Sequence, residues 1–347
     1  MGNEQKNYVV IDFCKFFFAI LIILLHTKPF REINAEFDFW FTQIVCRLAV
    51  PFFFIVSGFF VKDKMANGHK VFGYIKRLFV LYVLYFICYL PQTIMTWKVS
   101  GVQGKELIFF LGKYFLFVGS YYQLWYFLGL IVAVAILYCL VNICKLSIRT
   151  NFIIAICLYV IGVLGNTYNV LFMQIPVVGC ILPIYYKLFD TTRNGVFFGL
   201  LFVMTGYYIR KCASSWKRST CIIGLIIGML LMHLEVYGVR AYIGANTMDM
   251  TFSLYLVSIC LFMLLKTINF SQDNARLGCK LRVMSTLMFG WHMFIDYYLC
   301  AVFLLGFQKT LSSMVQAALT LVLTIVGAFV ILQVSECRLF KWIKIFY

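Results

Sequence analysis

Charged residues are scarce in this sequence. Only 12% of its 347 residues are Asp, Glu, Lys or Arg, whereas 63% are hydrophobic and the mean hydropathy is +0.92. Soluble domains contain about 25% charged and about 45–50% apolar residues. The apolar residues form repeated runs close to the ~20 residues that a transmembrane helix needs. The composition therefore excludes a soluble enzyme and predicts an all-α integral membrane protein.

Several other signals are missing. The 13 cysteines form no Cys-x-x-Cys pair and no Cys/His cluster with metal-ligand spacing, so we expect neither disulfides nor a metal site. The first apolar run is too long for a removable signal peptide and lacks a small-residue cleavage site, so we expect it to be retained as a span. Because there is no linker, low-complexity tract or soluble domain, residues 1–347 are predicted to form a single membrane domain.

Basic residues exceed acidic ones, and the net charge is +17. They occur in short clusters between apolar runs, which is typical of cytoplasmic loops and not of a nucleic-acid surface. Apolar runs separated by charge predict ten spans, at approximately 8–27, 37–61, 74–97, 122–143, 151–166, 195–209, 220–238, 250–268, 284–306 and 312–335. The segment 167–194, broken by glycines and prolines, is predicted to be a long outer loop with re-entrant or interfacial parts.

The distribution of Lys and Arg predicts the orientation of the spans. With both termini inside, the inner segments hold 18 of these residues and the outer segments hold 9. This excess favours an N-in, C-in topology.

The first span contains charges that hydrocarbon disfavours. Lys15 and His26 are eleven residues apart, which is about 1,100° of helix, so both lie on one face about 16 Å apart. Asp12 precedes Lys15 by three residues and is close enough to pair with it. Such groups usually face a bundle interior or a water-filled path. The alternative is that Lys15 and His26 extend to the two interfaces and do nothing specific.

The second span contains Arg47 and, further along, Pro51, Ser57 and Gly58. Arg47 is too deep to be a simple interface anchor. Ser57 and Gly58 let another group approach the backbone closely near the inner face. A proline kink with a small-residue packing seam explains Pro51 and Gly58 but leaves Arg47 unexplained.

Later segments supply further polar groups. His292 and Asp296 are four residues apart on one helix face, and with His26 on another span a shared cavity is favoured over an isolated core histidine. Glu235 and Asp249 flank an outer turn. Trp125 begins the fourth span within an aromatic belt.

These motifs resemble those of the membrane-bound acyltransferase family 3, which includes bacterial O-acetyltransferases, and the membrane half of the serine racemases of vancomycin resistance. The family opens with Asp-x-x-Arg, ten residues and His, and here Asp12, Lys15 and His26 take those places. The stretch "VPFFFIVSGFF" (50–60) resembles its next motif. Lys15 in place of arginine and Gln123 in place of a histidine common in the family are departures from its pattern, and lysine lacks the planar fork of arginine.

The resemblance implies acyl transfer, acetyl by default, from cytoplasmic acyl-CoA to a hydroxyl of an extracytoplasmic acceptor such as a cell-surface polysaccharide, in the bacterial inner membrane. It implies that the donor contacts Asp12, Lys15, Ser57, Gly58, Lys76 and Arg77. It implies His26 as general base, Arg47 as the residue that orients the acceptor or stabilises negative charge, and His292 as its partner. Glu235, Asp249 and Trp125 are expected on the acceptor side, with no metal.

Two other classes of function remain open at this stage. The same polar spans are compatible with a transporter of an amino acid such as serine or of another small solute, although no repeat relates the two halves of the chain. An inert or regulatory membrane domain is also compatible, but it leaves the intramembrane charges unexplained.

Overall fold

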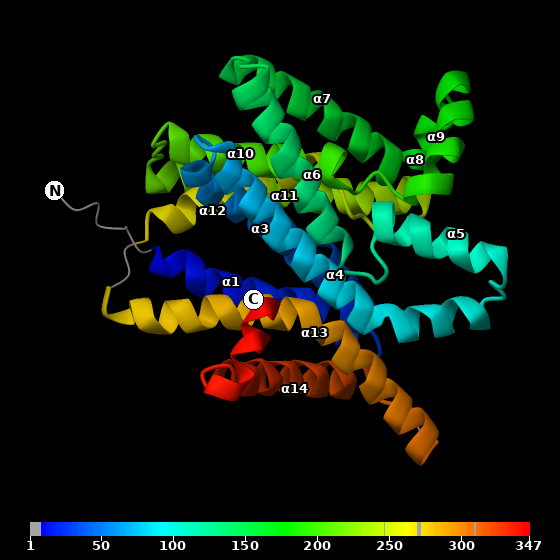
Figure 1. The fold of residues 1–347 in the computed structure, drawn as a ribbon. Coiled ribbons are helices and arrows are strands. Elements are labelled where there is room, and N and C mark those ends of the chain that lie inside the picture. Colours follow the sequence, from blue (N-terminus) through cyan, green and yellow to red (C-terminus); the bar gives the residue numbers. More distant parts are fainter. Residues whose placement is uncertain (1–7, 246, 269–271, 309) are drawn as a thin grey trace. The chain divides into compact units, whose positions relative to one another are not determined.

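The computed structural model describes residues 8–245, 247–268, 272–308 and 310–347, and within these ranges the regular structure is entirely helical (Figure 1). The longer helices are α1 (Val9–Thr27), α3 (Ala49–Val61), α4 (Gly68–Val99), α6 (Trp125–Tyr138), α7 (Ile148–Asn166), α10 (Leu200–Lys211), α11 (Arg218–Ile243), α12 (Phe252–Lys266), α13 (Ala275–Phe307) and α14 (Ser313–Val334). Shorter helices are α2 (Ala35–Trp40), α5 (Lys105–Lys113), α8 (Asn169–Phe172) and α9 (Pro176–Phe189). The prediction of an all-α fold is confirmed.

In the described part of the chain, eight helical segments are long and apolar enough to cross a membrane. They coincide with eight of the predicted spans. The predicted spans 195–209 and 250–268 correspond to shorter segments: a π-helical turn η6 (Gly195–Gly199) followed by α10, and α12. The protein is therefore a multi-pass membrane protein.

Two segments that were predicted to lie between spans contain more structure than predicted. The segment 167–194, predicted as a loop with interfacial parts, contains α8 and α9, and Pro183 lies inside α9. Before the fourth span, α5 continues into a π-helical turn η4 (Tyr114–Val118). Such helices are too short or too charged to resemble spans, so hydropathy alone does not reveal them.

The chain forms two compact units, and the single domain stays a prediction. Unit 1 consists of 1–49, 216–225 and 259–347, and unit 2 consists of 50–215 and 226–258. In unit 1, α1, α13 and α14 pack side by side. Asp12 on α1 contacts Arg282 on α13, and His26 further along α1 contacts His292. The two helices therefore run parallel, as expected for the first and ninth spans of an alternating topology.

In unit 2, α3 and α10 approach each other closely. A Cβ atom added at Gly58 would lie 1.9 Å from the carbonyl oxygen of Val203, and one added at Gly206 would lie 1.9 Å from that of Ile55. Small residues allow helices in membranes to pack backbone against backbone. Gly58 and Gly206 therefore form a packing seam between α3 and α10.

The helix before Pro51 departs from regular α geometry. After α2, the chain forms a π-helical turn η1 (Phe41–Val45) and a 3₁₀ turn η2 (Cys46–Leu48) before α3 begins. Proline has no N–H for the carbonyl four residues earlier, and its ring crowds that carbonyl. Such irregular turns within helices are frequent at functional sites.

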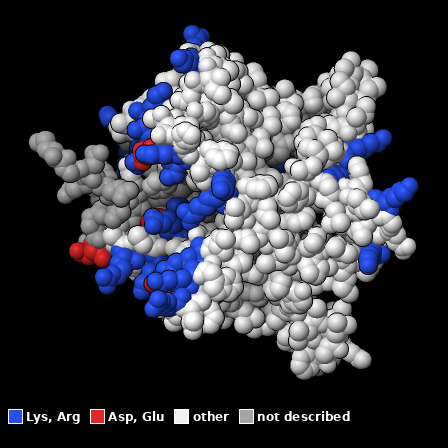
Figure 2. Space-filling model, in the orientation of Figure 1, with Lys and Arg blue, Asp and Glu red and all other residues white. Residues whose placement is uncertain are grey.

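Figure 2 shows the distribution of charge on one face of the molecule. Lys and Arg gather in clusters, and broad areas between them carry no charge. An uncharged surface of this kind suits contact with lipid, as the composition predicts. The N-in, C-in orientation stays a prediction.

Candidate active site

The first helix of unit 1 places two of the predicted site residues. Residues 9–27 contain no Gly or Pro, so α1 forms one uninterrupted apolar helix. It ends where Lys28 adopts a left-handed backbone conformation (φ 48°) and its N–H bonds to the carbonyl of Leu24. Pro29 follows and cannot continue the helix. His26 thus lies in the last turn of α1, and Lys15 lies three turns before it.

His26 on α1 lies against His292 on α13. Their ring centroids are 5.5 Å apart, and the ring planes are inclined by 34°. His292 is fully buried, and its Nδ1 lies 3.0 Å from the carbonyl oxygens of both Met288 and Phe289. Because carbonyls only accept, Nδ1 of His292 is the protonated nitrogen and Nε2 has the lone pair. Among the described residues, Nε2 has no hydrogen-bond partner. The structure thus brings the two histidines into contact, and the shared cavity favoured by the sequence stays a prediction.

Asp296 does not contact the His292 ring, although it lies one turn further along α13. Its carboxylate accepts hydrogen bonds from Gln316 (2.9 Å) and Thr320 (3.0 Å) on α14. These bonds hold α13 and α14 together near the histidine pair. Asp296 is thus a packing residue in this structure.

The predicted ion pair at the start of α1 has an additional member. Lys15 Nζ lies 3.5 Å from the Asp12 carboxylate, which confirms the pair. Arg282 on α13 lies 3.3 Å from the other oxygen of the same carboxylate. A guanidinium therefore occupies this cluster even though position 15 is lysine. The sequence gives no signal for this contact, because the two residues are 270 positions apart.

Arg47 lies in the 3₁₀ turn η2, which packs against α1 in unit 1. Its guanidinium donates to the side-chain oxygen of Gln43 at 2.8 Å. Arg47 is half-buried. Its expected role on the acceptor or on developing charge stays a prediction.

The predicted donor residues of unit 2 differ in their surroundings. Ser57 Oγ lies 3.3 Å from the Tyr126 hydroxyl. Lys76 and Arg77 are exposed on α4, as a site for an anionic ligand requires. The space beside Gly58 is filled by the main chain of Val203, so the packing alternative explains this glycine. Donor binding by all four residues stays a prediction, and the contact at Gly58 does not support it.

Glu235 forms hydrogen bonds with the start of α12. Its carboxylate accepts from the backbone N–H groups of Phe252 (2.8 Å) and Ser253 (2.9 Å), and from the hydroxyls of Ser253 and Tyr168. The first N–H groups of a helix lack partners within it, and a negative charge there is favourable. Glu235 therefore caps α12, which gives it a structural role beside the predicted acceptor role.

Asp249 and Trp125 are joined through Arg193, a residue that the sequence analysis did not select. The Arg193 guanidinium lies 2.8 Å from the Asp249 carboxylate and 4.7 Å from the centre of a Trp125 ring. Gln123 is buried, and its amide atoms have no partner among the described residues. The arrangement brings the predicted acceptor residues Trp125 and Asp249 to one place in unit 2.

The fold and the histidine pair are those of a polytopic helical protein with polar groups buried between its spans. Comparison with known proteins identifies the family. The chain belongs to the acyltransferase family described as "Acyltransferase domain", whose profile matches residues 8–333. It is 31% identical over 63% of its length to an amino-acid racemase of Enterococcus faecalis, covering 30% of that protein. It is 24% identical over 93% of its length to another from the same organism, covering 45% of that protein.

A serine/alanine racemase of Enterococcus gallinarum is also similar. It is 33% identical over 66% of this chain, and the match covers 33% of that racemase. The chain thus spans between 30% and 45% of the length of these curated relatives. No solved structure matches it significantly. The family resemblance predicted from the motifs is confirmed.

Proposed function

We propose that this protein transfers an acyl group, by default acetyl, from cytoplasmic acyl-CoA to a hydroxyl of an extracytoplasmic acceptor, such as a cell-surface polysaccharide. The proposal places it in the bacterial inner membrane. The observation that carries it is the contact between His26 and His292 from two membrane-length helices. Membership of the acyltransferase family supports acyl transfer in general.

The proposed reaction needs a base, because an alcohol hydroxyl is too weak an acid to attack a thioester unaided. A neutral imidazole is suited to this task and contributes typically 10²–10⁴-fold. In the proposal, His26 accepts the hydroxyl proton while the acceptor oxygen forms a bond to the thioester carbonyl carbon. The carbon–sulfur bond then breaks, and the thiolate leaves with the proton returned by His26.

His292 serves in this proposal as a positioning residue for His26. Its Nδ1–H is held by two main-chain carbonyls, which fixes the ring and its tautomer. The Nε2 lone pair of His292 therefore has a fixed position relative to the backbone of α13. A fixed, neutral neighbour of this kind orients a base without adding a charge.

The cations of α1 and α13 suit an anionic donor. Lys15 and Arg282 share the Asp12 carboxylate, so two positive charges face one negative charge there. Phosphate groups bind well to such clusters, particularly to the planar fork of arginine. We propose that this cluster of unit 1 contacts the phosphates of the donor, and donor binding by Lys76 and Arg77 of unit 2 stays a separate prediction.

The test is acetyl transfer from labelled acetyl-CoA in membranes that contain the protein or its His26→Ala variant. We expect the His26→Ala variant to label extracytoplasmic material at least 100-fold less than the unaltered protein does. His69→Ala is the matched control, since His69 is exposed at the start of α4. Near-normal transfer by His26→Ala would contradict the proposal.

Transport is separated from transfer by the same preparation. The names of the relatives refer to racemases of serine or alanine and of amino acids, but this chain covers less than half of each. Proteoliposomes that accumulate labelled serine, with no response to acetyl-CoA, would favour a carrier of amino acids instead. Transfer of label to an outer acceptor without serine uptake would favour the enzyme.

A further inference from the structure

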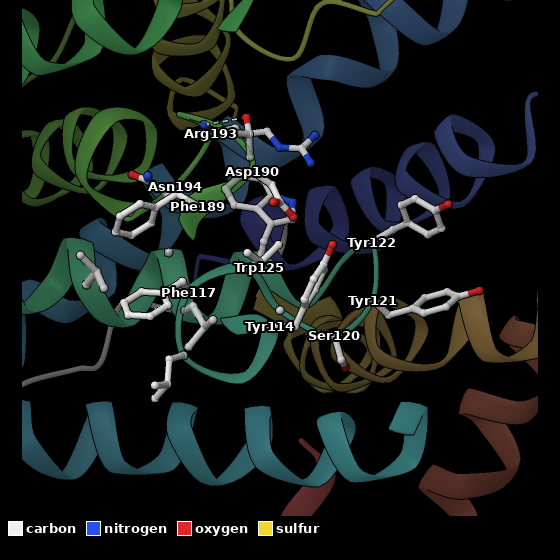
Figure 3. A pocket seen from close by; sticks show the side chains of 18 of the residues that line it. Tyr114, Phe117, Ser120, Tyr121, Tyr122, Trp125, Phe189, Asp190, Arg193 and Asn194 are labelled. Atoms are coloured by element: carbon white, nitrogen blue, oxygen red, sulfur yellow. Dashed lines mark hydrogen bonds between the residues drawn. The ribbon is translucent and has the colours of Figure 1, made fainter. Parts of the chain in front are cut away.

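A cavity of about 600 Å³ opens within unit 2. Its walls come from the later part of α4, residues 114–122, the first half of α6, and residues 189–196 (Figure 3). This volume is within the range of sites for drug-sized ligands, which is roughly 300–1,000 Å³. The cavity is therefore far larger than one serine molecule requires.

Aromatic rings line much of this cavity. They include Trp97, Tyr114, Tyr121, Tyr122, Trp125 and Phe189. The negative π-face of such rings attracts the weakly positive C–H groups of a flat ring-shaped ligand. Hydroxyl groups at the ring edge of the ligand then need polar partners around the wall. This combination matches the surface of a sugar ring better than that of an alkyl chain.

The two charged residues that line the cavity, Asp190 and Arg193, each form an ion pair with a residue outside its lining. Asp190 forms an ion pair with Lys113, and Arg193 lies 2.8 Å from Asp249. A charged ligand would have to displace one of these partners and leave the other without compensation, which is costly. An uncharged ligand can instead share the lone pairs of the Asp190 carboxylate, which has about four.

Neutral hydrogen-bonding groups complete the wall. Burial, reinforced by the Asp190 carboxylate, raises the pKa of the Tyr114 phenol, so it stays protonated at physiological pH. Ser120 Oγ is buried, and it has no hydrogen-bond partner in the described part of the chain. A buried hydroxyl of this kind is costly unless a ligand or water satisfies it.

Two residues with positive φ shape the backbone around the cavity. Asp190 ends α9 in a left-handed conformation (φ 58°), which aspartate tolerates. Gly119 has a φ of 89°, and an added Cβ would lie 2.6 Å from the backbone nitrogen of Trp125. Only glycine fits this turn, which leads the chain from η4 into α6.

From these observations we infer that the cavity binds an uncharged saccharide of one or two rings, with Trp125 as a stacking platform and Asp190, Tyr114 and Ser120 as hydroxyl partners. Calling this saccharide the acceptor rests on the proposed acyl transfer. Binding itself does not depend on that function.

The experiment measures binding without any acyl donor. The protein is reconstituted in phospholipid nanodiscs, because alkyl maltoside detergents themselves present a disaccharide. Cellobiose, maltose and diacetylchitobiose are titrated while tryptophan fluorescence is recorded, since Trp97 and Trp125 line the cavity. We expect a saturable change with at least one of the three. Serine and a disaccharide that contains a uronate should each bind at least tenfold more weakly.

Variants test whether the change in tryptophan fluorescence arises from binding in the cavity. Trp125→Phe and Asp190→Asn should each weaken the binding of the neutral disaccharide about tenfold, which corresponds to about 1.4 kcal/mol. Trp342→Phe, at an exposed tryptophan of the C-terminal 3₁₀ helix η8 (Arg338–Phe346), is the control and should leave binding unchanged. Lys113→Gln removes the partner of Asp190 and should increase the preference for the cationic sugar chitobiose.

Two results would overturn the inference. One is the absence of a saturable change with all three neutral disaccharides in a protein whose thermal unfolding is normal. The other is equal or tighter binding of serine or the uronate. His26→Ala should bind the saccharide normally while losing transfer. Saccharide binding by the unaltered protein without any acyl transfer would contradict the proposed function alone. Normal transfer without binding contradicts the cavity alone.

Discussion

Arg282 lies 3.3 Å from the Asp12 carboxylate and so joins α13 to α1 at the end where both helices begin. Lys15 lies 3.5 Å from the other oxygen of the same carboxylate. One buried carboxylate thus contacts two cations from parallel helices, which leaves the cluster with a net positive charge. The structure supplies an arginine here from α13, although α1 has lysine at the position where the family has arginine.

Asp12→Asn should destabilise unit 1 because it leaves the two cations without their carboxylate. Breaking a buried pair costs about 3–5 kcal/mol, but the Arg282 side chain is 47% exposed, so solvent screens part of this loss. We expect a loss of about 1–3 kcal/mol, measured by thermal unfolding. Asp12→Asn combined with Lys15→Met should recover part of it. Asp63→Asn, at a half-exposed acid, is the control and should change stability little.

His292→Asn should reduce kcat for acyl transfer about 10–100-fold with little change in KM, because His26 then loses its fixed neighbour. Asp296→Asn is the matched control one turn away. Its carboxylate bonds to Gln316 and Thr320, so this change should lower thermal stability and leave kcat nearly unchanged. Equal kinetic losses in both variants would indicate that His292 acts only through packing.

Gly58→Ala should prevent stable packing of α3 against α10. The new methyl group would lie 1.9 Å from the Val203 carbonyl oxygen, and main chain cannot move aside as a side chain can. Overpacking in a core costs typically 1–3 kcal/mol, and a backbone clash should reach at least the upper value. Gly73→Ala on α4 meets no atom within 4 Å and should be neutral. Differential scanning fluorimetry compares the two, and similar unfolding temperatures would refute the seam.

Glu235→Ala should destabilise the start of α12 by about 1–2 kcal/mol, the usual range for loss of a helix cap. Hydrogen exchange should increase first at the amides of Phe252 and Ser253, which Glu235 accepts from. Glu235→Gln should retain part of the effect because the amide oxygen still accepts. A large rise in KM for the acceptor at unchanged stability would instead support the predicted acceptor role. Glu106→Ala, at an exposed acid, is the control.

The spans could be predicted because hydrocarbon imposes one requirement on every crossing helix, namely a long apolar run. The pairing of Asp12 with Lys15 could also be predicted, since three residues make about one turn. A common location for His26 and His292 was indicated only by the fact that both histidines lie within predicted spans, where such residues are rare. No spacing between them in the sequence indicates it. These features depend on local sequence or on composition.

Contacts between distant segments could not be predicted. No local pattern connects Arg282 with Asp12, or Arg193 with Asp249 and Trp125. Gly58 has the same sequence signal whether a ligand or a second helix approaches it, and the Val203 main chain decides between the two. In the sequence, Glu235 cannot be distinguished from a surface acid. Its partners include backbone N–H groups, which nearly every residue has, so no residue pattern indicates the contact.

The parallel packing of α1 against α13 has a consequence for biosynthesis. Asp12 is translated 270 residues before Arg282, which at typical ribosome speeds of about 5–20 residues per second is a delay of roughly 15–50 seconds. During that interval the nascent first helix has its acid, amine and imidazole without the helix that will later cover them. Until α13 is made, Lys15 is the partner that Asp12 has within its own helix.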